Sequence, residues 1–414
     1  METNKEENSK INQDKNNLNQ KDTKKSKKIK DKNVCEKCSQ NPSKIYNRNK
    51  FLCLNCFNGI IIHKFKSNLR TCCKIRQEDY LLVCISGGNY SMAMLELFHQ
   101  SFNDSNSSRK LFFKIKILYI DDSILLREKS KIIEERQRRK LFLEQKMKEY
   151  NFDLDIIYLE KVMNLNDEKI NLKENNEYEN ILIEKYLQML DSISITGGYK
   201  TKFIQISINN LIFYYALKNK FIKIAFGNNG QGLVQQSFFN IITGYGKDIK
   251  HNIIHVDDTY LKGRILIYRP LQDFFDKEIS LFNHYHKVDI IYPVYKDDNL
   301  TKILSAFFGK LQNEKIHTVP SVINTAEKVV FYKNDKICKF CLCNLDKNKN
   351  KMEFGLDAFL NDENCLLNIE LCYGCRRMFT NIIQDFFDDE NKKKSDILIN
   401  EILNLFKCLL QDLK

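Results

Sequence analysis

Short apolar runs alternate with helix-length amphipathic stretches from Tyr80 onward, and this alternation limits the possible fold more than any other feature. Strands separated by helices usually pair in parallel, because each crossover helix returns the chain to the same side of the sheet. The sequence therefore predicts an α/β domain with a largely parallel sheet and helices on both faces. The predicted strands are Leu81–Ser86, Phe113–Ile120, Asp153–Leu159, Phe221–Phe226 and Arg264–Tyr268. The predicted helices are Ser91–Phe102, Ser123–Tyr150, Ile181–Asp191, Thr201–Lys220, Gly230–Thr243 and Asp276–His284.

The junction between the first predicted strand and its helix contains a candidate phosphate site. The strand Leu81–Ser86 runs into Gly87 and Gly88, and Ser91 opens the helix. Backbone N–H groups in such a loop, together with the positive end of the helix dipole, can approach a phosphate. A glycine pair is also common in strand-to-helix turns that bind nothing, so these six residues alone leave both interpretations open. The candidate nucleotide-binding residues are Ser86, Gly87, Gly88 and Ser91.

Paired cysteines predict metal sites near both ends of the chain. There are 14 cysteines and no secretory signal, which favours metal or redox chemistry because cytosolic thiols are kept reduced. The pairs Cys35-x2-Cys38 and Cys53-x2-Cys56 have the spacing of two zinc knuckles. The pairs Cys338-x2-Cys341 and Cys372-x2-Cys375 form a second set with a longer loop between them. We expect one or two zinc ions, although four thiolates also suit an iron–sulfur cluster.

The other cysteines match no complete metal motif. Cys343 and Cys365 lie beside the second set and are either substitute ligands or bystanders. Small buried apolar side chains are the expected role of the rest, which are Cys72, Cys73, Cys84 and Cys408.

Positive charge is concentrated at the N-terminus. The formal net charge is +13, and residues 35–76 hold nine Lys or Arg against one acidic residue, interleaved with aromatic residues and cysteines. Such a patch is typical of nucleic-acid binding. Residues 1–34 are also basic, but their Asn/Lys low complexity is more typical of a solvated tail. No uncharged apolar run approaches the roughly 20 residues of a membrane span, and we expect a cytoplasmic protein without a membrane partner.

Composition and motifs together divide the chain into five predicted parts. These are a disordered basic tail at 1–34, a four-cysteine zinc-type module at 35–76, an α/β domain at 77–330 with a disordered insertion at 162–180, a second Cys-rich module at 331–380, and a C-terminal helix at 381–414 whose amphipathic part is Ser395–Leu413.

The order of several motifs resembles one known family. Ser86-Gly-Gly-x-x-Ser91 resembles the pyrophosphate loop of ATP-pyrophosphatases. The other motifs are the cysteine-rich head Phe51–Phe57, Ala225–Asn229, Gly244–Gly246, Tyr268–Leu271, Thr318–Lys328 and the paired cysteines of Cys372–Arg376. In this order, over roughly residues 35–380, they are similar to the cytoplasmic tRNA 2-thiolation protein 2 family. The resemblance implies an adenine nucleotide alpha hydrolase-like fold and a heterodimer with a related catalytic thiolase subunit. It also implies tRNA binding, sulfur from a thiocarboxylated ubiquitin-like carrier, and lysine, glutamate and glutamine tRNAs as substrates.

Three departures from an active enzyme indicate that the chemistry belongs to the partner. Tyr90 stands where an active pyrophosphate loop carries Asp, which would help to organise Mg²⁺ and ATP. The segment Gly227–Gly232 has no acidic residue, and Ser192–Lys202 lacks the Cys pair of a catalytic relative. We therefore expect a non-catalytic, tRNA-binding subunit, and leave open whether ATP still binds.

Two alternatives remain open at the level of sequence. In the first, the chain is an active ATP-dependent tRNA sulfurtransferase that uses the glycine loop and a nucleophile such as Cys84. In the second, it is a zinc-dependent nucleic-acid-binding adaptor with no role in thiolation.

Overall fold

The computed structural model of the chain describes residues 33–103, 111–165, 176–193, 196–292, 294, 298–315, 317–329, 336–345 and 370–384. The chain divides into two compact units, Met1–Ile60 and Ile61–Lys414. No helix among the described residues is long and apolar enough to cross a membrane. Of the predicted C-terminal helix 381–414, residues 381–384 form the end of the helix Tyr373–Gln384, and the amphipathic part Ser395–Leu413 lies outside the described residues. The predicted tail also lies outside them apart from residues 33 and 34.

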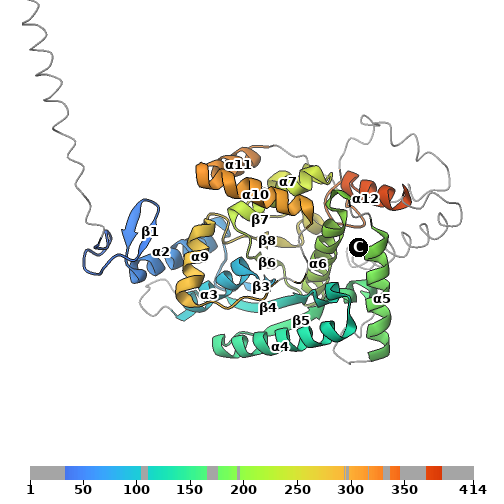
Figure 1. Cartoon of the computed structure of the whole chain (residues 1–414), viewed down its shortest axis with the longest axis horizontal. Helices are drawn as coiled ribbons and strands as arrows, with labels where there is room; N and C mark the ends of the chain where they lie inside the picture. Colours follow the sequence, from blue (N-terminus) through green and yellow to red (C-terminus); the bar gives the residue numbers. More distant parts are fainter. Residues whose placement is uncertain are drawn as a thin grey trace, which may run out of the picture. The chain divides into compact units, whose positions relative to one another are not determined.

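The first unit is built around a short antiparallel hairpin (Figure 1). Its strands are β1 (Ile45–Asn47) and β2 (Lys50–Leu52). The two turn residues between them, Arg48 and Asn49, have φ values of 46° and 62°. Positive φ at both positions is the mark of a type I′ turn, whose twist matches that of the flanking strands. The helix α2 (Leu54–Ser67) begins directly after the hairpin.

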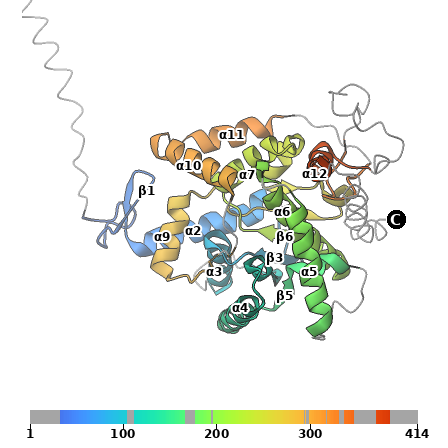
Figure 2. The same ribbon diagram turned by 45° about the vertical axis from the view of Figure 1, so that its right-hand side comes forward.

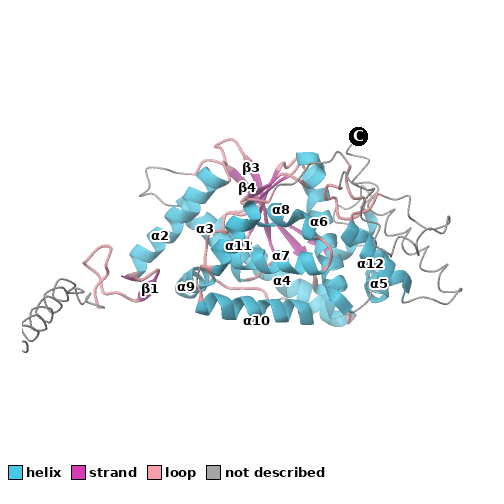
Figure 3. Ribbon diagram, turned by 90° about the horizontal axis from the view of Figure 1, so that it is seen from above, coloured by secondary structure: helices cyan, strands magenta, loops and turns pink. Residues whose placement is uncertain are grey.

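The second unit contains a sheet of six strands in the order β5-β4-β3-β6-β8-β7. Figure 3 shows helices surrounding these strands. All neighbours pair in parallel except β7 and β8, so the predicted largely parallel sheet is confirmed. Every residue of the central strand β3 after Tyr80 is buried, as expected for a strand covered on both faces. The strands are β3 (Tyr80–Ile85), β4 (Lys114–Asp121), β5 (Leu154–Tyr158), β6 (Lys223–Phe226), β7 (Val256–Asp257) and β8 (Leu266–Tyr268).

Ten further helices belong to the described part of this unit. Among them, α10 and α11 pack against α7 as a helical layer (Figure 2). Phe239 of α7 and Phe308 of α10 lie in the small hydrophobic cluster between these helices. The helices are α3 (Asn89–Asn103), α4 (Lys129–Tyr150), α5 (Asn176–Ser192), α6 (Tyr199–Lys218), α7 (Gly230–Ile242), α8 (Ile249–Ile253), α9 (Asp276–His286), α10 (Asn299–Glu314), α11 (Thr318–Glu327) and α12 (Tyr373–Gln384).

The structure differs from the sequence prediction at two internal segments. The predicted helix Ser123–Tyr150 is interrupted, because Arg127 has a φ of 68° and separates a 3₁₀ turn from α4. Both ends of the predicted disordered insertion 162–180 are ordered. Residues 162–165 close a 3₁₀ turn with Val162 buried in the core, and α5 begins at Asn176. Residues 166–175 lie outside the described residues.

The second cysteine segment is packed into the main hydrophobic core. The ring of Phe340 stacks on Phe203 of α6 at 6.0 Å and meets Phe379 of α12 edge-on at 5.0 Å. The side chain of Asn210 donates a hydrogen bond of 2.9 Å to the Phe340 carbonyl. The described residues of this segment thus fold together with the α/β core, while the predicted domain boundaries remain predictions.

Candidate metal centres and the glycine loop

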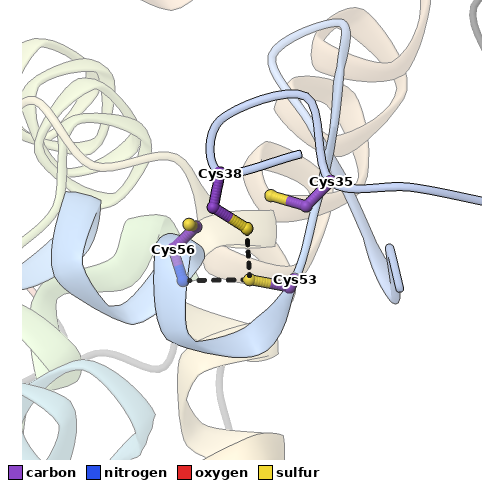
Figure 4. Close-up of side chains that lie close together, drawn as sticks. All are labelled: Cys35, Cys38, Cys53 and Cys56. Atoms are coloured by element: carbon purple, nitrogen blue, oxygen red, sulfur yellow. Dashed lines mark hydrogen bonds between the residues drawn. The ribbon is translucent and has the colours of Figure 1, made fainter. Parts of the chain in front are cut away.

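The first cysteine set converges on one point in the N-terminal unit. The thiol groups of Cys35, Cys38, Cys53 and Cys56 all lie within 4.8 Å of one another, and Figure 4 shows their side chains facing each other. The Sγ atoms of Cys38 and Cys53 are 3.9 Å apart. Zinc–sulfur bonds of about 2.3 Å at tetrahedral angles separate neighbouring thiolates by about 3.8 Å. The geometry therefore fits a single tetrahedral ion.

The electrostatics of this set also favour a cation. Burial acts to raise the pKa of the Cys35 thiol, but backbone N–H groups that donate to it outweigh burial and lower the pKa to about 6. Burial and then the neighbouring thiols raise the pKa of Cys56 to about 12. One thiolate thus opposes ionisation of the next. A divalent cation removes this conflict, because it compensates several thiolates at once.

The second cysteine set is more deeply buried. Its thiols also lie within 4.8 Å of one another, and the Sγ atoms of Cys341 and Cys372 are 3.6 Å apart. The hydroxyl group of Tyr245 donates to Cys375 Sγ at 3.4 Å. Burial, followed by neighbouring thiols, raises the pKa of Cys375 well above its ordinary value. These four sulfur atoms likewise fit one ion, and the members of the set are Cys338, Cys341, Cys372 and Cys375.

A lysine lies beside this second set. The ammonium group of Lys202 sits 4.3 Å from the centre of the Tyr245 ring and donates to Asn240 Oδ1 at 2.7 Å. Burial lowers the pKa of Lys202, while the thiols of the set act in the opposite direction. A four-thiolate zinc site has a net charge of −2, so a nearby ammonium group stabilises its loaded form. Sequence reasoning missed this residue because it lies far from the cysteines along the chain.

The remaining cysteines are placed as follows. Cys343 Sγ lies 3.2 Å from Cys341 Sγ as a fifth thiol beside the second set. Cys73 and Cys84 are buried as predicted, whereas the prediction is wrong for Cys72, which is only half-buried. Cys365 and Cys408 lie outside the described residues.

The glycine loop between β3 and α3 is closed by its own neighbours. Gly87 has a φ of 78°, and a Cβ atom at this position would lie 2.6 Å from Ile291 Cβ. The Ile291 N–H group donates to the Gly87 carbonyl at 2.8 Å. The hydroxyl groups of Ser86 and Ser91 lie 3.2 Å apart, and Ser91 donates to the Gly88 carbonyl at 3.0 Å. The side chains that would contact a phosphate are therefore hydrogen-bonded within the loop.

The second glycine segment approaches the same loop. A Cβ atom on Gly227 would lie 2.7 Å from the Cα atom of Ser91, so only glycine permits this close approach. At the next turn, Asn229 caps α7 by accepting a hydrogen bond of 3.0 Å from the Gly232 N–H group. The structure thus brings together the two segments that the sequence resemblance singled out.

Asp276, an acidic residue of α9 that was not predicted from the sequence, lies beside the glycine loop. Asp276 accepts a hydrogen bond from the Asn229 side chain and another from the Tyr90 hydroxyl group. Burial, and then the charge of Asp276, raise the pKa of Tyr90, which keeps the phenol neutral. Tyr90, which stands where an active loop carries Asp, is thus a neutral phenol hydrogen-bonded to Asp276.

A small cavity lies beside the N-terminus of α7. Its volume is about 100 Å³, and its lining includes Gly230, Gln272 and Asp276. Pockets for small ligands usually have volumes of about 300–1,000 Å³. This cavity is too small to accept a nucleotide without rearrangement.

Comparisons with known proteins agree with the resemblance predicted from the sequence. No protein-family model matches the chain. A zebrafish (Danio rerio) protein is 24% identical over 372 residues, which cover 77% of this chain and 73% of that protein. A Drosophila erecta protein is 24% identical over 379 residues, which cover 83% and 89% of the two chains. Both are named cytoplasmic tRNA 2-thiolation protein 2, so the resemblance is confirmed. Their names agree with the predicted cytoplasmic location.

A solved structure confirms the predicted fold class. The U34-tRNA thiolase NcsA from Methanococcus maripaludis, described with its [4Fe-4S] cluster, superposes with a TM-score of 0.50 at 15% identity. The match covers 76% of this chain and 97% of that one.

Proposed function

We propose that this chain is a non-catalytic, tRNA-binding subunit of the cytosolic complex that 2-thiolates the wobble uridine of lysine, glutamate and glutamine tRNAs. Its heterodimer partner would be a related catalytic thiolase, and sulfur would come from a thiocarboxylated ubiquitin-like carrier. The names of the relatives and the thiolase-like fold support a role in tRNA thiolation. The closed glycine loop carries the proposal that the role is non-catalytic.

A nucleotide would have to displace contacts that the loop already makes. Phosphate oxygens need free N–H and hydroxyl donors, but Ser86 and Ser91 bond each other and Ile291 packs on Gly87. The loop has no carboxylate of its own to hold Mg²⁺, and Asp276 is engaged by Tyr90 and by a second side chain. Adenylation by this chain alone is therefore not expected.

This chain also lacks a suitable thiol for sulfur transfer. Sulfur relay needs a thiolate, and the described residues of the segment 192–202 contain no cysteine. Cys84, in strand β3 just before the glycine loop, is the alternative nucleophile. Burial raises the pKa of Cys84 far above neutrality, so it stays a thiol. This counts against the interpretation of the chain as an independent sulfurtransferase.

The N-terminal unit, which contains the β1–β2 hairpin, supports a role in binding RNA. Its exposed cations can contact phosphates. The Tyr46 ring packs against Phe51 at 4.8 Å but is 46% exposed, and its exposed part would stack on a base. Among the described residues of this unit the acidic side chain is Glu36, which accepts a hydrogen bond of 3.1 Å from the Phe51 N–H group. The exposed cations are Lys37, Lys44, Arg48 and Lys50.

Zinc is the proposed metal of both cysteine sets. A single ion accounts for thiol separations near 3.8 Å, whereas a four-iron cluster binds each thiolate through a different iron and holds them farther apart. When bound, zinc would supply folding energy to the small N-terminal unit, as in zinc fingers.

The decisive experiment measures turnover with and without the partner. The full chain, incubated with ATP, tRNA and a sulfur donor, should release no AMP or pyrophosphate and form no 2-thiouridine. Addition of the co-purified partner should restore both products. Turnover by the chain alone would overturn the non-catalytic assignment. Unchanged wobble thiolation after deletion of the gene would instead favour the nucleic-acid-binding adaptor.

A matched pair of variants tests the RNA-binding role. Replacement of Lys37, Lys44 and Lys50 by alanine should lower the salt dependence of tRNA affinity by about 3 in logarithmic slope, about one for each phosphate contact. The control removes the same charge from exposed lysines of α10 and the end of α11, by alanine at Lys302, Lys310 and Lys328. Equal slopes for the two variants would place the tRNA elsewhere.

A further inference from the structure

We propose that Cys72, His255 and Asp273 bind a third zinc ion, at a site separate from both four-cysteine sets. Their ligand atoms all lie within 4.8 Å of one another. The distance from His255 Nε2 to Asp273 Oδ2 is 3.3 Å. Zinc bonds of about 2.0–2.2 Å to nitrogen and oxygen, at tetrahedral angles, separate these two atoms by about 3.4 Å. Thiolate, imidazole and carboxylate are all common ligands of zinc.

The hydrogen bonding of the histidine prepares it to bind a metal. His255 Nδ1 lies 3.3 Å from the carbonyl oxygen of Arg269. A carbonyl oxygen can only accept, so Nδ1 is the donor and Nε2 is the ring nitrogen that faces Asp273. A backbone carbonyl that holds the other ring nitrogen is the usual support of a metal-bound histidine. The distance between Nε2 and Oδ2 suits an ion bound by both atoms, and the Cys72 thiol supplies a third ligand within 4.8 Å.

The three ligands come from segments that are fixed to one another within the second unit. Cys72 ends the π-helical turn Asn68–Cys72, and the buried Asn68 side chain donates to the Pro270 carbonyl at 2.9 Å. The Arg269 N–H group donates to the His255 carbonyl at 2.9 Å. The ammonium group of Lys64 donates to the Asp273 carbonyl at 2.6 Å. These bonds hold the ligands in place before the ion arrives, which lowers the cost of ordering them.

Exposure distinguishes this site from the cysteine sets. Cys72 and His255 are half-buried, and the Asp273 carboxylate is 49% exposed. Solvent therefore reaches the fourth coordination position, and water completes the tetrahedron. Three protein ligands with one open position is the arrangement of zinc sites that bind an exchangeable ligand.

The test compares zinc content and ligand type in the full chain loaded with zinc. Mass spectrometry should show one equivalent less zinc in His255→Ala and in Cys72→Ser than in the unmodified chain. X-ray absorption should show a nitrogen and oxygen shell at about 2.0–2.1 Å beside the sulfur shell at about 2.3 Å. The four-cysteine sets contribute sulfur only, so this shell should vanish in His255→Ala.

The control is His284→Ala, which removes an exposed histidine of α9. It should keep the full zinc content and the nitrogen and oxygen shell. Circular dichroism checks that all variants are folded. If His255→Ala does not fold, a folded Cys72→Ser provides the test. Equal zinc content in the Cys72 and His284 variants, or a spectrum with sulfur ligands alone in the unmodified chain, would overturn the proposal.

Discussion

The substitution Gly87→Ala separates a structural role of the glycine loop from a role in nucleotide binding. Gly87 has a φ of 78°, in the left-handed region that alanine adopts at a cost of about 1–2 kcal/mol. The new Cβ atom would also lie 2.6 Å from Ile291 Cβ, where both the side chain and the backbone must shift. Overpacking of this kind costs about 1–3 kcal/mol. Together these terms lower the free energy of unfolding by about 2–5 kcal/mol.

The neighbouring glycine is the matched control. A Cβ atom on Gly88 would lie 3.5 Å from Ser86 Oγ, an ordinary contact, and Gly88 has no positive φ. Gly88→Ala should therefore change stability by less than about 1 kcal/mol. If the loop bound phosphate through its backbone, both methyl groups would obstruct the ligand. The two variants would then differ little in nucleotide affinity.

The assay is urea unfolding of the zinc-loaded chain, followed by circular dichroism because the chain has no tryptophan. Isothermal titration with ATP and Mg²⁺ runs in parallel on the same samples. We expect a large shift of the unfolding midpoint for Gly87→Ala alone, and no heat of nucleotide binding for any variant. Equal stability of the two variants would refute the packing argument. ATP binding that both substitutions abolish would show a working phosphate site.

Three further predictions concern the metal, the RNA and the pH dependence of stability. Cys53→Ser should remove one equivalent of metal and weaken tRNA binding, measured by mass spectrometry and filter binding, because zinc stabilises the small N-terminal unit. Tyr46→Ala should weaken tRNA binding by about 1–3 kcal/mol with an unchanged salt slope, since a lost stacking contact releases no counterions. A hydrogen bond from Arg138, and to a smaller extent one from Arg139, lowers the pKa of Glu135 from an ordinary value of 4.5 to about 2. The stabilisation by Glu135 is therefore present above pH 4.5 and is lost as the pH falls toward 2, and Glu135→Gln should flatten acid unfolding curves in this window.

The parallel sheet could be predicted from sequence because its strands are continuous apolar runs between helical stretches. The strand β7 could not, since two residues, Val256 and Asp257, show no periodicity. The break at Arg127 was missed for another reason. Arg127 is neither Gly nor Asn, the residues that usually announce a left-handed position, so nothing in the local sequence marks the end of the 3₁₀ turn.

The cysteine sets were predictable because zinc knuckles have a local spacing, which the structure brings together as four thiols in each case. The site formed by Cys72, His255 and Asp273 has no such spacing. Its ligands come from a helix end and two separate loops, and only the tertiary fold makes them neighbours. The same holds for Asp276, which reaches Tyr90 from α9. Contacts between distant segments carry no signature in a single sequence.

A Ser-Gly-Gly-x-x-Ser motif in this chain is explained without a nucleotide. Gly87 is required by its φ and by Ile291, and Gly227 is required by the backbone of Ser91. The two serines are required by the hydrogen bonds that close the loop. Ser86, Gly87 and Ser91 are therefore needed to close the turn after β3 whether or not a phosphate binds, whereas Gly88 is not. The difference between the two roles lies at Tyr90, where a carboxylate could hold Mg²⁺ but a neutral phenol bonded to Asp276 cannot.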